Sequence, residues 1–247
     1  GARADRNRGV LIGPAMKLHD YFRSSAAYRV RIALNLKGLT AERAFVHLRR
    51  GAQLADDYRA LNPQRLVPVL ETDDGQVITQ SLAIIEYLDE THPLPPLLPA
   101  DAPGRARVRS IALAIACDIH PLNNLRVLQY LTGTLGVPDA ARDGWYRYWC
   151  DTGLEALERR LAADAATGAF CHGAAPTLAD ACLVPQLMNA RRMAVDLTAF
   201  PTLSRIEGVS DLKAGAADAD LVVEAVPERM DLKRRIFADL DALAPAH

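Results

Sequence analysis

The sequence lacks several features that would each define a class of function. Its formal net charge is −1 at pH 7, so it has no basic excess to attract nucleic acid. No apolar run approaches the roughly 18 residues that a membrane span needs. There is no glycine-rich nucleotide-binding loop, no H-E-x-x-H and no G-x-S-x-G. We therefore expect a soluble, cytoplasmic protein with neither a nucleic-acid nor a membrane partner.

Cysteines and histidines are also few and show no paired spacing. The cysteines have no C-x-x-C spacing and are Cys117, Cys150, Cys171 and Cys182. They are typical of reduced thiols in a cytosolic protein. The six histidines are scattered without the spacing of metal ligands. We expect no metal site.

The length of 247 residues leaves room for two domains with separate cores. Half of the residues are hydrophobic and 24% are charged, which is typical of a globular protein. Residues 1–15 carry arginines but too short an apolar run for a secretory signal. We expect them to be a disordered extension ahead of Met16, a plausible natural start.

Residues 16–95 alternate between strand and helix patterns, and we predict one α/β domain there. Strand patterns cover 17–22, 44–48, 67–71 and 76–79, the last two around the hairpin signal Asp73-Asp74-Gly75. Helix patterns cover 28–37 and 81–91, with Ser81 expected to cap the second helix.

A proline-rich stretch then separates this domain from a region without strand signals. We assign 96–104 as the linker and 105–206 as an all-helical domain. The pattern of 105–131 predicts one long helix that Pro121 bends, and 143–163 predicts a second. Thr177 and Asp180 fit a capping box that begins a third helix ending near Arg192.

Residues 207–247 differ from this helical pattern. A buried-strand pattern at 219–225 and an amphipathic helix at 231–243 are anomalous after a purely helical domain. We expect a foreign strand–helix tail that packs poorly, because a lone strand lacks a sheet partner.

The strongest local motif is Arg23-Ser24-Ser25, which lies between the first strand and the first helix. Serines at a helix N-terminus lie beside unpaired backbone N–H groups and the positive end of the helix dipole. An anion is stabilised there, and a hydroxyl that donates to a bound thiol would favour the thiolate. Simple helix capping is the alternative explanation.

Two further motifs adjoin strands. Pro68 at a strand entrance is a natural site for a cis peptide bond, which would turn the Val67 backbone toward an extended ligand. Gln80 and Ser81 occupy a strand-to-helix turn suited to holding an α-carboxylate. An edge-strand proline without a role and ordinary helix capping are the alternatives.

The helical region offers two polar clusters. His120, Asn124 and Arg126 lie near the predicted kink at Pro121 and could face a cleft between the domains. They could equally form a solvated helix face. Arg191 and Arg192 end the third helix. Arg192 could hold a carboxylate bidentately. Alternatively, it could only complement the negative end of the helix dipole.

Together these motifs resemble the zeta class of glutathione transferases, and within it the bacterial maleylacetoacetate isomerases. The resemblance runs from about residue 16 to 206. Its carriers are 23–34 (Arg-Ser-Ser-Ala-Ala-Tyr-Arg-Val-Arg-Ile-Ala-Leu), 60–64 (Ala-Leu-Asn-Pro-Gln), 66–68 (Leu-Val-Pro), 80–88 (Gln-Ser-Leu-Ala-Ile-Ile-Glu-Tyr-Leu), 118–124 (Asp-Ile-His-Pro-Leu-Asn-Asn) and 177–180 (Thr-Leu-Ala-Asp). Many members carry cysteine after the two serines, where this chain has Ala26.

The resemblance implies a thioredoxin-like N-terminal domain, an all-α C-terminal domain and a homodimer that binds glutathione. It implies isomerisation of maleylacetoacetate to fumarylacetoacetate by reversible thiolate addition, a step of aromatic amino-acid breakdown. The implied roles are thiolate stabilisation for Ser24 and Ser25, glutathione binding for Gln53, Val67, Pro68, Gln80, Ser81, His120 and Asn124, and binding of the acidic substrate for Arg23, Arg126 and Arg192.

Residues from about 208 to 247 resemble a different family, the NAD-dependent 3-hydroxyacyl-CoA dehydrogenases. A dinucleotide-binding domain needs a glycine-rich turn before this segment, and the chain has none. We therefore predict no NAD binding and interpret the tail as the product of a fusion or a frameshift.

Three alternatives to the maleylacetoacetate isomerase remain open at this stage. The first is a maleylpyruvate isomerase, because the polar clusters suit either dicarboxylate. The second is a general glutathione transferase or dehalogenase. The third is an inactive glutathione-binding fusion product.

Overall fold

A four-stranded sheet forms the first part of the fold. The computed structural model of the chain describes residues 16–205. The strands are β1 (Lys17–Asp20), β2 (Glu42–Phe45), β3 (Val69–Glu71) and β4 (Val77–Thr79), in the order β2-β1-β3-β4. β1 and β2 are parallel, whereas β3 is antiparallel to both β1 and β4. The mixed sheet bears out the expected α/β domain.

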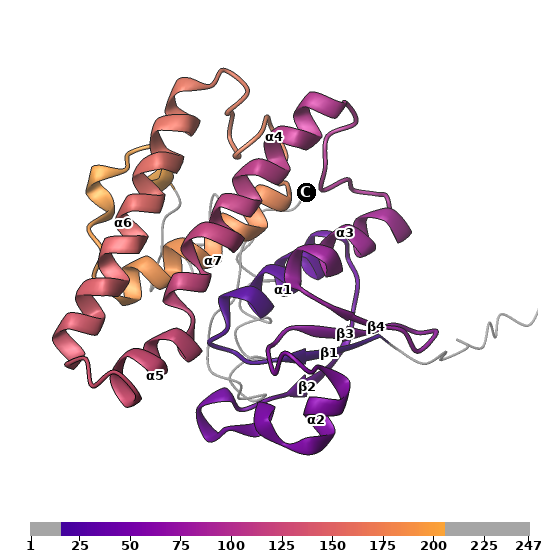
Figure 1. Cartoon of the computed structure of the whole chain (residues 1–247). Coiled ribbons are helices and arrows are strands. Elements are labelled where there is room, and N and C mark those ends of the chain that lie inside the picture. Colours follow the sequence, from indigo (N-terminus) through magenta and orange to yellow (C-terminus); the bar gives the residue numbers. More distant parts are fainter. Residues whose placement is uncertain (1–15, 206–247) are drawn as a thin grey trace, which may run out of the picture.

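Helices cover both faces of this sheet. Figure 1 shows α1 (Ser25–Leu36) and α3 (Ser81–Thr91) between the sheet and the helical part of the chain, with α2 (Asp56–Leu61) on the other side. Two 3-10 turns, η1 (Leu48–Arg50) and η2 (Ala52–Leu54), lead from β2 toward α2.

The second strand differs from its prediction. The alternation of apolar residues predicted a strand at 44–48, but β2 ends at Phe45. Val46 is still buried, and its N–H donates to the carbonyl of Asp20 at 2.8 Å. The chain then turns, because Leu48 begins the 3-10 turn η1. The apolar alternation therefore predicted the burial of Val46 correctly, but it predicted wrongly that the strand continues to Leu48.

The remaining described residues are helical. The elements are α4 (Ala102–Leu113), the π-helical turn η3 (Ala114–Ile119), the 3-10 turn η4 (Pro121–Asn123), α5 (Leu125–Gly133), α6 (Asp139–Ala163), α7 (Leu178–Arg192), η5 (Leu197–Ala199) and η6 (Leu203–Arg205). α7 is largely buried and packs against α1 and α4. The fold of residues 16–205 is thus an α/β domain followed by a helical one, and no helix of this part is long and apolar enough to cross a bilayer.

The prediction of one long helix over 105–131 is wrong. The helical region begins earlier, at Ala102, because the side chain of Asp101 caps α4 by accepting from Gly104 N at 2.7 Å. α4 then passes into a π-helical turn, and Pro121, which has no N–H, begins a separate 3-10 turn. The side chain of Asn124 caps α5 as a new helix. A break with its own cap therefore replaces the expected bend.

The predicted capping box of the third helix is confirmed. The Asp180 carboxylate accepts from the backbone N–H and the hydroxyl of Thr177, each at 2.8 Å. Its other oxygen accepts from Cys171 N at 2.8 Å. This buried carboxylate therefore fixes where α7 begins and ties the preceding loop to it.

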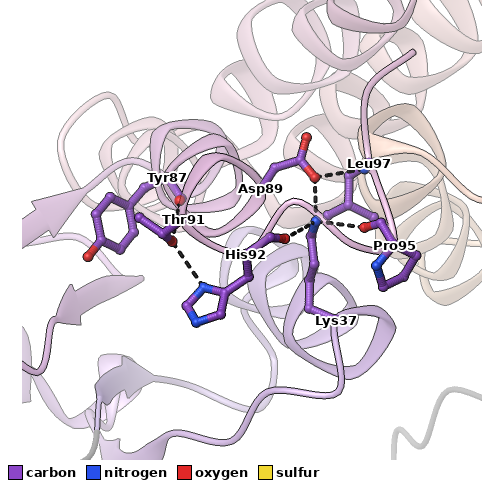
Figure 2. Close-up of polar contacts among 7 residues, drawn as sticks. All are labelled: Lys37, Tyr87, Asp89, Thr91, His92, Pro95 and Leu97. Atoms are coloured by element: carbon purple, nitrogen blue, oxygen red, sulfur yellow. Dashed lines mark hydrogen bonds and ion pairs between the residues drawn. The ribbon is translucent and has the colours of Figure 1, made fainter. Parts of the chain in front are cut away.

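A buried lysine fixes the end of the first domain just before the linker, as Figure 2 shows. The Lys37 side chain is 0% exposed and forms an ion pair with Asp89. Its ammonium also donates to the carbonyls of His92 at 2.7 Å and Pro95 at 2.6 Å. Three acceptors thus satisfy the three N–H donors of one ammonium group.

The same network continues into the helical domain. Asp89 Oδ1 also accepts from Leu97 N at 2.8 Å, and Leu97 O accepts from Leu178 N at 2.9 Å. Leu178 is the first residue of α7. A continuous chain of polar contacts therefore joins the end of α1 to the start of α7. The predictions for residues 1–15 and for the tail lie outside the described residues.

Candidate active site

Ser24 lies where the chain leaves β1 and enters α1. It is the N-cap of α1, and its Oγ accepts from Ala27 N at 3.2 Å. Ser25 follows as the first helical residue and is buried, whereas Ser24 is half-buried. The capping interpretation of Ser24 is therefore confirmed. It is compatible with an anion at the same helix N-terminus, since the hydroxyl hydrogen stays available to donate.

A cavity of about 270 Å³ opens between α1 and α7 at these serines. The residues that line it are Phe22, Arg23, Ser24, Ser25, Tyr28, Arg31, Pro185, Met188, Asn189 and Arg192. The fold thus brings Arg23 and both serines to the same cavity as Arg192, although the sequence separates them widely. None of these lining residues is acidic.

Positive charge gathers at the mouth of this cavity. Partial burial, followed by the charges of Arg49 and Arg192, lowers the pKa of Arg23 below its ordinary value. Arg192 is exposed and lies 3.5 Å from Asn189 Oδ1 through its NH1 group. Guanidinium groups near one another without a carboxylate between them favour a bound anion.

A further guanidinium in the cavity is already paired. Arg31 Nε lies 3.7 Å from the buried carboxylate of Asp20, and NH2 donates to the carbonyl of Phe22 at 3.4 Å. Its guanidinium lies over the Tyr28 ring, 4.7 Å from the centroid. Arg31 therefore shapes the wall, and Arg23 and Arg192 supply the uncompensated charge.

A second group of predicted residues meets around Arg29. NH1 of this arginine donates to Ser81 Oγ at 3.2 Å, and NH2 lies 3.3 Å from His120 Nδ1. Arg29 is only 2% exposed. It lies one turn after Ser25 on the same face of α1, so it links the serine cavity to Ser81 and His120.

The strand-to-helix turn before Ser81 differs from its prediction. Gln80, rather than Ser81, is the N-cap residue of α3, and its φ is 73°. Its side-chain amide donates to Gln64 Oε1 at 2.9 Å. Ser81 is the first helical residue and is buried. Its hydroxyl is therefore free of the capping role and contacts Arg29 instead.

His120 lies between two cations. Burial, then the charges of Arg29 and Arg126, lowers the pKa of His120 to about 3. Its imidazole is therefore neutral at physiological pH. Asn124 caps α5 by accepting from Arg126 N at 3.2 Å, and the Arg126 side chain is exposed.

The remaining predicted residues lie on the first domain. The Val67–Pro68 peptide bond is cis, as predicted. Gln53 is half-buried in η2, and its Oε1 has no hydrogen-bond partner within the described part of the chain. Neither these residues nor the group around Arg29 line the 270 Å³ cavity. The structure therefore divides the predicted site into the cavity residues and the group around Arg29, which α1 connects, and a third set at Gln53, Val67 and Pro68.

Sequence reasoning missed several residues of the site. Arg29 belonged to the helix motif without an assigned role, although its i+4 spacing from Ser25 predicts a shared face. Asn189 is three residues before Arg192 on α7 and shares its face. Nothing local marked Tyr28, Pro185 or Met188 as cavity residues, since the packing of α7 on α1 decides their place.

A larger cavity of about 340 Å³ lies over α2 and is a poor candidate. Its lining residues are Asp56, Arg59, Ala60, Pro63 and Arg65. Its lining holds charges of both signs, and Arg59 pairs with Asp56 at 3.3 Å. We place the functional site at α1 and α7, where the lining charge has one sign. No cluster of metal-ligating side chains occurs in residues 16–205.

Comparison with known proteins agrees with this fold. The family described as "Glutathione S-transferase, N-terminal domain" matches residues 23–91. A probable maleylacetoacetate isomerase of Vibrio cholerae is 50% identical over 214 residues, covering 85% of this chain and 97% of the relative. The class that the fold and the site define is that of the glutathione transferases.

Solved structures narrow the class further. A maleylpyruvate isomerase described as a bacterial zeta-class glutathione transferase is 48% identical, with a TM-score of 0.75 over 82% of this chain and 93% of its own. A maleylacetoacetate isomerase of Methylobacterium extorquens, with bound malonate and glutathione, is 40% identical, with a TM-score of 0.76 over 93% and 100%. The chain belongs to this zeta-class family of maleylacetoacetate and maleylpyruvate isomerases.

A second family overlaps the end of the chain. The pattern described as "3-hydroxyacyl-CoA dehydrogenase, NAD binding domain" matches residues 179–247. The match supports the resemblance noted for 208–247. It also begins inside α7, earlier than the sequence analysis placed the junction.

Proposed function

We propose that the chain is a glutathione-dependent cis–trans isomerase that converts maleylacetoacetate to fumarylacetoacetate. The observation that carries the proposal is the cavity where Ser24, at the N-terminus of α1, faces Arg192 from α7. An acidic substrate matches the positive charge of this cavity. The family relatives named above act on the same class of substrate, as their names state.

The described residues fit glutathione. Ser24 and Ser25 lie at a helix N-terminus that favours a sulfur anion. The buried Oε1 of Gln53 has no hydrogen-bond partner within residues 16–205, so it can accept from a peptide N–H. We assign glutathione binding to Gln53, to the backbone at Val67 and Pro68, and to Gln80 and Ser81.

Each further residue has a role in this proposal. When bound, glutathione would supply a thiolate nucleophile for reversible addition to the cis double bond, which is the chemistry that cis–trans isomerisation needs. Ser24 donates to the sulfur and favours the thiolate. Arg23 and Arg192 hold the substrate carboxylates and stabilise the negative charge that develops on the substrate. His120 and Asn124 contact glutathione, and Arg126 contributes positive charge beside them.

The assembly and location are part of the same proposal. Glutathione transferases are generally dimeric, and we propose a homodimer in the cytoplasm that does not bind NAD. Native mass spectrometry of the full chain tests the dimer. A monomer at micromolar concentration would contradict this part alone.

The decisive experiment measures turnover of maleylacetoacetate and of maleylpyruvate, with and without glutathione. We expect turnover that requires glutathione, and the ratio of kcat/KM values identifies the better substrate. Turnover that is independent of glutathione would overturn the mechanism.

A matched pair of variants tests the arginine assignment. Arg192→Ala removes a cavity residue, whereas Arg191→Ala removes its exposed neighbour, which does not line the cavity. We expect Arg192→Ala to lower kcat/KM for the dicarboxylates about a hundredfold while transfer to an uncharged electrophile is retained. Equal losses in the two variants would contradict the assignment.

A further inference from the structure

Arg29 is a buried cation that has no carboxylate partner among residues 16–205. It is 2% exposed, and its two contacts within the described residues are with Ser81 and His120. Burial lowers its pKa below the ordinary value. A buried charge without a counter-ion lowers stability, so its presence indicates a role beyond holding the fold together.

The chemistry of the guanidinium group determines what its partners can do. Arginine has five N–H donors and no acceptor. At the 3.3 Å contact, His120 Nδ1 must therefore accept, which places the ring proton on Nε2. At the 3.2 Å contact, Ser81 Oγ accepts as well, which leaves its O–H free to donate elsewhere. Each of these two side chains thus keeps its one hydrogen free to donate to a ligand, Nε2–H on His120 and O–H on Ser81.

The charges around His120 favour its neutral form. Arg29 on α1 and Arg126 on α5 both disfavour the imidazolium. Besides His120, the titratable groups that act on Arg29 are the thiols of Cys117 on η3 and Cys182 on α7. Burial raises the pKa of Cys182 to about 11. Within residues 16–205, the charges that act on His120 are therefore both positive and disfavour its protonated form.

We propose that Arg29 is a positioning residue that makes Ser81 and His120 permanent hydrogen-bond donors to a carboxylate of bound glutathione. A carboxylate only accepts, so the two donors match it. Ser81 belongs to α3 and His120 lies in the helical domain, so the ligand is held from both domains. Both side chains remain donors between pH 5 and 8, because His120 stays neutral over this range. The inference deepens the proposed function and rests on it.

The first test reads the tautomer of His120 directly. The full chain, labelled with ¹⁵N and without glutathione, is studied by NMR correlation of the imidazole nitrogens, and His120→Gln identifies the signal. We expect a neutral ring with the proton on Nε2 from pH 5 to 8. A proton on Nδ1, or an imidazolium at pH 6, would overturn the inference.

The second test removes the guanidinium. Arg29→Gln should weaken glutathione binding at least tenfold. It should also give the dissociation constant a new inflection at acidic pH, because removing the Arg29 charge raises the pKa of His120, which burial and Arg126 still lower. Arg29→Gln combined with His120→Gln should lack the inflection. Arg109→Gln, which breaks a half-buried pair with Glu86 away from His120, is the control and should show neither effect.

The outcomes separate this inference from the proposed function. If Arg29→Gln binds glutathione with no new pH dependence, the positioning role is wrong even if isomerisation is found. The native chain could instead show the expected tautomer but neither bind glutathione nor isomerise the substrate. The proposed function would then be wrong, and so would the assignment of a glutathione carboxylate as the acceptor, whereas the role of Arg29 in fixing the donor state of His120 would stand. If Arg29→Gln does not fold, the tautomer of the native protein still decides.

Discussion

At the scale of single residues, Ser24 combines a structural contact with the proposed chemistry. Its Oγ caps α1 through Ala27 N, and the same hydroxyl can donate to a sulfur. We expect Ser24→Ala to cost about 1 kcal/mol in the free energy of unfolding and about a hundredfold in kcat. Ser24→Thr, which keeps the hydroxyl, should retain most of both. Denaturant unfolding and turnover measure the two effects, and full activity of Ser24→Ala would refute the assignment.

His120 gives stability a dependence on pH with a defined sign. Its pKa is about 3 in the folded protein against about 6.5 in an unfolded chain. Below pH 6.5 the unfolded chain takes up a proton that the folded protein does not, so folding stability falls as the pH falls. Between pH 7 and 5 the loss from this residue is at most about 2 kcal/mol.

The measurement compares urea unfolding of the native chain and of His120→Gln at pH 7 and pH 5. The native chain should lose more stability on acidification than the variant does. His92→Gln, which changes an exposed histidine, is the control and should behave as the native chain. A variant that matches the native chain at both pH values would show that His120 is not held neutral.

At the scale of helices, the position of α7 on α1 depends on the buried network of Figure 2. Lys37→Met would leave the Asp89 carboxylate uncompensated and two carbonyls without donors. We expect a loss of about 3–5 kcal/mol in the free energy of unfolding. Lys17→Met, which breaks a half-exposed pair with Glu71 at 3.7 Å, should cost less than about 0.5 kcal/mol.

Lys37→Met should also affect the cavity at the far end of the two helices. If the network sets how α7 lies on α1, the variant raises the KM for the dicarboxylate more than it lowers kcat, because Arg192 moves relative to Ser24. Denaturation in urea and steady-state kinetics measure the two consequences. Unchanged stability would contradict the importance of the network.

At the scale of the whole molecule, ligand binding distinguishes the two family resemblances. Glutathione at a hundred times its dissociation constant should stabilise the chain by about 2.7 kcal/mol, a rise of roughly 5–10 °C in Tm. NAD at the same concentration should give no shift, although residues 179–247 match a dinucleotide-binding family. A thermal shift assay checks both, and stabilisation by NAD would overturn the predicted absence of NAD binding.

Much of the fold could be predicted because its signals are local. The order of strands and helices follows from apolar periodicity, and Thr177 and Asp180 are close enough in sequence to reveal their capping box. The cis peptide at Pro68 follows from its place at a strand entrance. The motif at Ser24 and Ser25 pointed to the correct helix N-terminus for the same reason, since capping is a contact within one turn.

Only the tertiary structure decided which of these residues share a cavity and what neutralises them. The break at η3, the pairing of Arg31 with Asp20 and the burial of Arg29 depend on segments far apart in the chain. Burial and pairing of a charge are properties of the packed neighbours, which no local pattern encodes. The sequence by itself therefore determined the order of most elements, the caps at Ser24 and Thr177 and the family, because these signals are local. Packing decided that Arg192 lines the same cavity as Ser24 and that Arg29 contacts Ser81 and His120.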